Sequence, residues 1–179
     1  MEESILLWIQ ENLRFEWLTP IVKGVTSLGN SGILWIILSA LFLIFKKTRK
    51  TGLMTSAALI FDLVSVNVIL KNLAARTRPY ELIEELTILI EKQSDYSFPS
   101  GHTAASFAFV SVLWFTAPKK VSVPLTVLAS LIALSRLYLG VHYPTDILGG
   151  VVIGILCGIA AVALVNFIEK KIKAKKETR

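Results

Sequence analysis

The stretch from Ile147 to Ile168, ILGGVVIGILCGIAAVALVNFI, carries no charged residue. A helix needs about 20 mostly apolar residues to cross the hydrocarbon core of a bilayer. The Leu, Ile, Ala and Val residues of this stretch follow one another without the alternation that is typical of a barrel strand. The stretch therefore predicts a transmembrane helix.

Four other stretches have the same character, namely residues 24–45, 51–70, 97–118 and 121–135. Asp62 is the only Asp, Glu, Lys or Arg residue within them, and His102 is the only histidine. A lipid-exposed backbone must satisfy its hydrogen bonds internally, which favours helices. We therefore expect an all-α, polytopic membrane bundle with five transmembrane helices, formed by a single domain over residues 1–179.

The composition agrees with this class of protein. Hydrophobic residues make up 54% of the chain and charged residues 18%, with a mean hydropathy of +0.63. A soluble domain averages about 45–50% apolar and about 25% charged residues. These values argue against a soluble domain and a disordered chain, and the single cysteine argues against a disulfide scaffold.

The first 23 residues are apolar but interrupted by Glu11, Arg14, Glu16 and Lys23. Charges at that density are expensive inside a bilayer and normal for a helix that lies in the membrane interface. Pro20 also interrupts the run. We favour an N-terminal interfacial helix, and a sixth span is the alternative.

The net charge of +6 is distributed unevenly between the loops. One set of loops and the C-terminal tail carry the basic residues Lys46, Lys47, Arg49, Lys50, Lys119, Lys120, Lys170, Lys171, Lys173, Lys175, Lys176 and Arg179. The positive-inside rule makes that side cytoplasmic and turns the loops at 71–98 and 136–146 outward. We expect a multi-pass protein of the cell membrane with a cytoplasmic C-terminus. A basic tail of this kind anchors the topology on anionic lipid, so nucleic-acid binding is not expected.

The first outward loop begins with KNLAARTRP, Lys71 to Pro79. Lys71 and Arg78 stand seven positions apart, so a continuing helix would place both on one face. These two cations could bind an anion on the outward side. The alternative is that they only extend to the lipid headgroups.

The second motif is PSGH, Pro99 to His102, directly before an expected span. Ser100 and Gly101 at a helix start leave backbone N–H groups free, and the helix dipole adds positive charge. His102 on the first turn would face an anion bound there. It could instead be an ordinary interfacial histidine.

The third motif is SRLYLGVHYPTD, Ser135 to Asp146. The planar fork of Arg136 suits phosphate oxygens. His142 and Asp146 are four apart, and a carboxylate that holds one ring nitrogen leaves the other free as a base or nucleophile. The alternative is that Asp146 only caps the following helix.

The three motifs fall on the same side of the membrane by a topology argument that did not use them. Three cations, a helix start, two histidines and an aspartate are what phosphoryl transfer through a phosphohistidine requires. The motifs contain no cluster of carboxylates, so Mg²⁺ or Ca²⁺ is not required. Two histidines and an aspartate could hold a transition metal, but the cations favour an anionic ligand. We therefore expect no metal and no cofactor.

These motifs resemble the three-part signature of the type 2 phosphatidic acid phosphatase superfamily, membrane lipid phosphatases related to the vanadium haloperoxidases. The signature K-x6-R-P, P-S-G-H and S-R-x5-H-x3-D is matched in order within residues 71–146. The resemblance implies a metal-independent phosphatase in which His142 attacks phosphorus while Asp146 holds its other ring nitrogen. It implies that His102 protonates the leaving oxygen and then helps to activate water. By the same resemblance, the phosphoryl oxygens are held by Lys71, Arg78, Arg136, Ser100 and Gly101.

The resemblance also bears on the substrate and on the spans. Small, outward-facing bacterial members dephosphorylate undecaprenyl diphosphate to undecaprenyl phosphate, and this is the expected reaction. Phosphatidylglycerophosphate and phosphatidate are alternative substrates within the family, and a transporter or flippase that binds a phospholipid without hydrolysis is an alternative of another class. Family members commonly have six spans, one more than the five expected here.

Three features remain open from the sequence. The acidic loop 81–95 is either a lid that limits substrate choice or a solvated face. A structural hydrogen bond is the favoured role for Asp62. The spacing of Gly150, Gly154 and Gly158 indicates helix–helix contact, and such a face could also form a homodimer.

Overall fold

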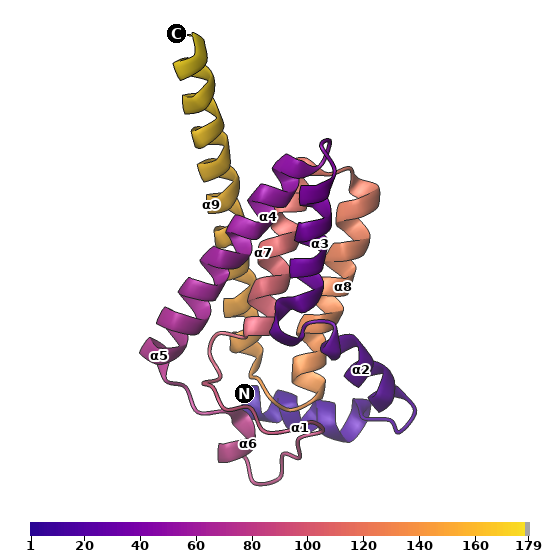
Figure 1. Ribbon diagram of the computed structural model, residues 1–179. Helices are drawn as coiled ribbons and strands as arrows, with labels where there is room; N and C mark the ends of the chain where they lie inside the picture. Colours follow the sequence, from indigo (N-terminus) through magenta and orange to yellow (C-terminus); the bar gives the residue numbers. More distant parts are fainter. Residues whose placement is uncertain (178–179) are drawn as a thin grey trace.

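The computed structural model describes residues 1–177 and is all-helical, with no strand within that range. Arg179, one of the tail residues used in the charge argument, lies outside it. The longer helices run roughly side by side in an upright bundle (Figure 1). In chain order they are α1 (Glu2–Leu13), α2 (Leu18–Ser27), η1 (Asn30–Gly32), α3 (Ile33–Ile44), α4 (Arg49–Asp62), the π-helical η2 (Leu63–Leu70), α5 (Lys71–Ala74), α6 (Pro79–Leu82), α7 (Gly101–Thr116), α8 (Lys119–Tyr138) and α9 (Pro144–Glu177).

Helix α7 is the centre of the bundle, because it packs against α4, α8 and α9 at once. One apolar cluster joins α3, α7 and α8 around Trp35, Phe109 and Ile132, all fully buried. The indole of Trp35 also donates a hydrogen bond to Ser106 Oγ over 2.9 Å. A second cluster joins α4, α7 and α9 around Met54. The site residues at the ends of these helices are therefore held by one continuous core.

The glycines of α9 explain how closely α7 and α9 approach. A Cβ on Gly154 would lie 2.4 Å from the carbonyl oxygen of Ala104, and one on Gly158 would lie 1.8 Å from Ser111 Oγ. Gly150 faces the backbone of Ser100 in the same way. This face of α9 is thus occupied within the chain, as the expectation of helix–helix contact requires. A homodimer through α9 stays a prediction and would have to use another face of that helix.

The outer surface of the bundle is apolar, as expected of helices that face lipid. Exposed side chains on α3, α4, α8 and α9 include Ile36, Ile37, Ile60, Leu131, Leu134, Leu148, Val152 and Leu156. Three helical segments are long and apolar enough to cross a membrane, namely Arg49–Leu82, Lys119–Tyr138 and Pro144–Glu177. The pair Leu18–Ser27 and Asn30–Ile44 makes a fourth if it acts as one span.

The expected number of five spans is therefore not confirmed. Residues 24–45 form two helices bent by 42°, because Ser31 and Gly32 adopt the left-handed region with φ of 50° and 65°. Residues 97–118 contain α7, which has 16 residues. A helix of that length extends about 24 Å, less than the roughly 30 Å of the hydrocarbon core.

The N-terminal residues do not form a span of their own. Helix α1 lies across the lower end of the bundle in Figure 1. It is docked there by Leu6, which is fully buried against Ile83, Leu86 and Tyr143. Residues 18–23 belong instead to α2, the first half of the bent pair. This arrangement agrees with the interfacial helix favoured above, although only for the first 13 residues.

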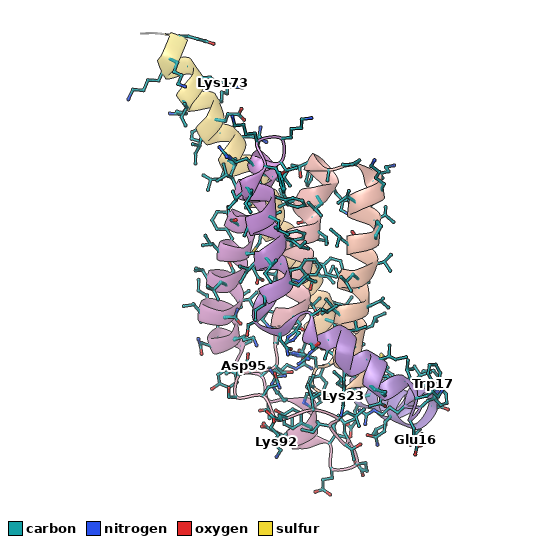
Figure 2. All side chains as sticks on the ribbon, turned by 45° about the vertical axis from the view of Figure 1, so that its right-hand side comes forward. Glu16, Trp17, Lys23, Lys92, Asp95 and Lys173 are labelled. Atoms are coloured by element: carbon teal, nitrogen blue, oxygen red, sulfur yellow. The ribbon has the colours of Figure 1, made fainter. Side chains whose placement is uncertain are left out.

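The two ends of the bundle carry the loops that the charge argument separated. The turns between α3 and α4 and between α7 and α8 lie at the upper end with the C-terminal part of α9 (Figure 1). Figure 2 shows Lys173 at that end and Lys92 and Asp95 at the other. The predicted grouping of the loops is thus present in the structure. Which end faces the cytoplasm stays a prediction.

Candidate active site

A cavity of about 780 Å³ opens at the lower end of the bundle. Its polar part is lined by residues from all three sequence motifs: Lys71, Arg78, Gly101, His102, Arg136 and His142. Its other wall is formed by apolar side chains of α3, α4 and the start of η2, among them Ile36, Leu43, Leu59, Ile60 and Leu63. The tertiary structure therefore brings the three motifs together and joins them to an apolar surface.

Three cations of this cavity are almost completely buried. The exposed fractions are 4% for Lys71, 3% for Arg78 and 1% for Arg136. Arg136 donates from Nη1 to Thr26 Oγ1 over 2.8 Å, but its Nε has no hydrogen-bond partner. Buried charges without partners are costly. The arrangement is therefore that of a site for an anion.

Two of these cations share one carboxylate, that of Asp95. Asp95 Oδ1 accepts a hydrogen bond from Arg78 Nη2 over 2.5 Å, and Oδ2 pairs with Lys71 Nζ. Partial burial alone would raise the pKa of the Asp95 carboxyl, but the contacts with Lys71 and Arg78 outweigh it and lower that pKa to about 2. Asp95 is thus a permanent anion in the anion site.

Arg78 also joins two loops of the site. Its Nε donates to the carbonyl oxygen of Asp95 over 2.8 Å, and Nη1 donates to the carbonyl oxygen of Val141 over 2.8 Å. Nη1 lies 3.5 Å from His142 Nε2. The guanidinium therefore fixes the place of His142 relative to the cations.

His142 and Asp146 meet as the spacing predicted. His142 Nδ1 lies 3.4 Å from Asp146 Oδ2. An ionised carboxylate only accepts hydrogen bonds, so Nδ1 carries the proton and Nε2 keeps its lone pair. Burial lowers the pKa of His142 to about 4, and the nearby Arg78 and Arg136 act in the same direction. The ring is therefore a neutral base or nucleophile at ordinary pH.

His102 lies in the first turn of α7 and faces the same cavity. Its Nε2 lies 3.0 Å from the side-chain oxygen of Asn30. Gly29 allows this approach, since a Cβ there would lie 2.8 Å from the imidazole Cδ2. The bend between α2 and α3 therefore positions His102, and no signal in the sequence connects Asn30 with it.

The structure separates Ser100 and Gly101. Gly101 lines the cavity, whereas Ser100 is fully buried and is not part of the lining. The N–H of Ser100 donates to the carbonyl oxygen of Asp146 over 3.1 Å, and its hydroxyl accepts a hydrogen bond from Thr103. The expectation of a free N–H at Ser100 is thus wrong, because a carbonyl oxygen in the first turn of α9 accepts its hydrogen bond. Gly101 remains placed to contact an anion.

Two further residues hold Asp146 and were not found from the sequence. Ser97 donates from Oγ to Asp146 Oδ2 over 2.5 Å, and Arg76 donates from Nη1 to Asp146 Oδ1 over 2.6 Å. Arg76 falls in the variable part of its motif, and Ser97 stands outside the motifs. Only their position next to Asp146 reveals them.

Asp62 does not make the structural hydrogen bond expected of it. It is 3% exposed and lines the cavity, but its Oδ1 has no hydrogen-bond partner. Within residues 1–177, no three His, Cys, Asp or Glu side chains are grouped as a metal site.

Comparisons with known proteins match most of the chain. Residues 51–170 match the family described as the PAP2 superfamily. The chain is 32% identical over 145 residues to an undecaprenyl-diphosphatase of Sulfolobus acidocaldarius, which covers 78% of this chain and 70% of the relative. It is 33% identical over 175 residues to phosphatidylglycerophosphatase B of Bacillus subtilis, with coverage of 90% and 80%. The crystal structure of Aquifex aeolicus LpxE superposes with a TM-score of 0.77 and 30% identity over 89% of this chain and 93% of that one.

Proposed function

The chain belongs to the PAP2 superfamily, and from this premise we propose that it hydrolyses undecaprenyl diphosphate to undecaprenyl phosphate through a phosphohistidine intermediate. Its relatives are named phosphatases of lipid phosphates and diphosphates, so the chain is a membrane lipid phosphatase. The resemblance of the three motifs to this family is thereby confirmed. The substrate and the chemical steps are our proposal.

One observation carries the proposal: three buried cations and the His142–Asp146 pair share a cavity with an apolar wall. The cations fit a phosphate or diphosphate headgroup. The wall of α3 and α4 fits a hydrocarbon chain that enters from the bilayer. A lipid phosphate has a charged headgroup joined to a hydrocarbon chain, and the cavity has a cationic part joined to an apolar wall.

In the first step, His142 Nε2 attacks phosphorus in line with the leaving oxygen. The Nε2–P bond forms and the bond between phosphorus and the leaving oxygen breaks. His102 enters this step protonated and gives its proton to that oxygen, so undecaprenyl phosphate leaves and the His102 ring becomes neutral. Lys71, Arg78 and Arg136 neutralise charge on the phosphoryl oxygens, which is the larger part of catalysis in phosphoryl transfer.

In the second step, water hydrolyses the phosphohistidine. His102, now without the proton it gave away, accepts one from the attacking water. The O–P bond forms, the Nε2–P bond breaks and inorganic phosphate is released. Asp146 stabilises the imidazolium character of His142 in both steps because it accepts the Nδ1 proton.

Phosphatidylglycerophosphate is the second candidate substrate. The observation that favours it is the identity to phosphatidylglycerophosphatase B, which extends over 90% of this chain. The diphosphate is preferred here because its two phosphates are directly linked, so three cations in one cavity can contact both of them, whereas glycerol separates the two phosphates of phosphatidylglycerophosphate. Phosphatidate, with one phosphate, is the third candidate to compare.

The test is phosphate release by the detergent-solubilised protein in EDTA. Undecaprenyl diphosphate, phosphatidylglycerophosphate and phosphatidate are each supplied at equal concentration. We expect the highest kcat/KM with the diphosphate. A higher value with phosphatidylglycerophosphate would replace the proposed substrate by the second candidate.

The variants His142→Ala and His102→Ala test the chemical steps. We expect His142→Ala to lose at least about 1000-fold in kcat, as for removal of a nucleophile. Brief acid-free quenching of wild type with ³²P-labelled substrate should trap label on protein, and none should be trapped on His142→Ala. Binding of every lipid phosphate without any release by the folded wild type would instead favour the transporter or flippase reading.

A further inference from the structure

We propose that Arg76 is a positioning residue for the nucleophile, and that Glu2 of the surface helix α1 holds Arg76 in place. The inference rests on the proposed function in one respect, since it takes His142 as the nucleophile. The chain of contacts runs from Glu2 through Arg76 and Asp146 to His142. It connects a helix at the end of the bundle with the reacting nitrogen.

Both terminal nitrogens of the Arg76 guanidinium donate hydrogen bonds to side chains. Nη1 donates to Asp146 Oδ1 over 2.6 Å and to Thr145 Oγ1 over 2.7 Å. Nη2 donates to Glu2 Oε2 over 2.7 Å. The guanidinium carbon lies 4.0 Å from the ring centroid of Tyr143, a cation–π contact. The planar fork is therefore fixed in direction as well as in place.

The two oxygens of Asp146 have different partners. Oδ2 accepts from Ser97 Oγ over 2.5 Å and from the Tyr143 N–H over 2.8 Å, and it faces His142 Nδ1. Oδ1 accepts from Arg76. Without Arg76, one oxygen of a fully buried carboxylate loses its charged donor. The carboxylate would then turn or draw the other donors toward Oδ1, and His142 Nδ1 would lose its acceptor.

Glu2 binds Arg76 on the side away from Asp146, and it also binds Thr145. Its Oε1 accepts from the N–H of Thr145 over 3.0 Å and from Thr145 Oγ1 over 2.6 Å, while Oε2 pairs with Arg76. The slight burial of Glu2 would by itself raise its pKa, but the hydrogen bonds from Thr145 and Arg76 lower it. Glu2 is thus an anion that touches both the start of α9 and Arg76.

Helix α1 fixes the position of Glu2 because further residues of the N-terminal segment are also bound to the lower end of the bundle. Leu6 is fully buried, and Gln10 donates from Nε2 to the carbonyl oxygen of Glu85 over 2.8 Å. Arg14 donates from Nε to the carbonyl oxygen of Tyr138 over 2.9 Å. The docking of α1 therefore determines where Glu2 stands, and through Arg76 it bears on the orientation of Asp146.

The kinetic test compares Arg76→Gln, Arg76→Lys and Glu2→Gln with wild type. Glu3→Gln is the matched control, because Glu3 is the exposed neighbour that changes the charge of α1 by the same amount. We expect kcat to fall about 100-fold in Arg76→Gln, since misplacement of a reacting group by about 1 Å has that effect. Arg76→Lys should recover part of this loss, and Glu2→Gln should lose about threefold to tenfold. KM should stay within about threefold of wild type throughout.

A residue that binds substrate or only supports the fold would give other results. A rise in KM with unchanged kcat would overturn the positioning role, and so would a kcat of Arg76→Gln within twofold of wild type. Equal losses in Glu2→Gln and Glu3→Gln would overturn the part played by Glu2. If Arg76→Gln does not fold, Glu2→Gln still tests the proposal, because Glu2 is partly exposed and its replacement is expected to leave the fold intact.

A measurement without turnover separates this inference from the proposed function. The chain contains two histidines, so ¹⁵N-histidine labelling gives two ring systems, and His142→Asn assigns them. We expect His142 of wild type to hold its proton on Nδ1, and Arg76→Gln to show a mixture of the two tautomers. An unchanged tautomer in Arg76→Gln would overturn the inference even if the lipid is hydrolysed. Absence of hydrolysis by wild type would overturn the proposed function, while the tautomer would still decide the role of Arg76.

Discussion

Asp95 Oδ1 lies 2.5 Å from Arg78 Nη2, so a carboxylate of the acidic loop 81–95 forms an ion pair with one of the three buried cations of the site. The other oxygen of Asp95 pairs with Lys71. A phosphate that binds these two cations has to displace this carboxylate or share them with it. The last residue of loop 81–95 thus contacts two cations of the site, and we expect it to compete with the phosphate of the substrate for them.

Replacing Asp95 by Asn should strengthen the binding of inorganic phosphate. The Asp95 side chain is 48% exposed, and an ion pair of that kind contributes about 1 kcal/mol, or roughly fivefold in a binding constant. Isothermal titration with phosphate should thus give a Kd about fivefold lower for Asp95→Asn. The phosphate-free variant should also unfold at a lower temperature, because two buried cations lose their partner.

Glu91→Gln is the matched control for this experiment. Glu91 is an exposed acid of the same loop, and its removal changes the net charge equally. Phosphate affinity should stay unchanged in it. If Asp95→Asn binds phosphate more weakly than wild type, then Asp95 organises the cations and does not compete with phosphate.

The His142 ring should stay neutral down to about pH 4. Burial lowers its pKa to about 4, whereas an ordinary histidine titrates near 6.5. Between these values the unfolded chain binds more protons than the folded one, so the stability that this group contributes is lost as the pH falls from 6.5 to 4. A ¹⁵N-histidine titration of the folded protein measures the pKa. A value near 6.5 would contradict the burial of this ring.

Replacing Arg136 by Met should weaken the binding of phosphate and raise the stability of the phosphate-free protein. Its guanidinium is 1% exposed, with Nε unpartnered, and an apolar side chain of similar volume in place of a poorly paired buried charge stabilises by about 1–3 kcal/mol. Thermal unfolding without phosphate should thus occur at a higher temperature in Arg136→Met. Added phosphate should raise the unfolding temperature of wild type more than that of the variant. A lower unfolding temperature without phosphate would mean that Arg136 supports the fold through Thr26.

Gly154→Ala should destabilise the bundle at the contact of α7 and α9. The added Cβ would lie 2.4 Å from the carbonyl oxygen of Ala104 and 2.9 Å from the nitrogen of Ala108, and these backbone atoms cannot turn away. The expected loss is about 1–3 kcal/mol, measured as a lower unfolding temperature. Gly24→Ala is the control, because a Cβ there meets nothing within 4 Å. It should be neutral or stabilise by up to about 1 kcal/mol.

The helices and the grouping of the motifs could be predicted from the sequence because both depend on local patterns. An uncharged stretch such as 147–168 forms a helix in a bilayer whatever its neighbours are. The alternation of basic and acidic loops places Lys71, His102 and His142 at one end of the bundle. The spacing of His142 and Asp146 is itself a property of one short segment. These features need no knowledge of how the helices pack.

The partners of the site residues could not be predicted, because they come from distant segments. Asp146 accepts a hydrogen bond from Arg76, 70 positions away in the chain, and Arg76 in turn donates to Glu2. His102 contacts Asn30 at the bend before α3. The same is true of the N–H of Ser100, which donates to the carbonyl oxygen of Asp146 in the first turn of α9. No spacing rule connects such residues. A hydrogen bond or ion pair forms wherever packing brings its two atoms within about 3 Å, and packing is settled only when all the helices are in place.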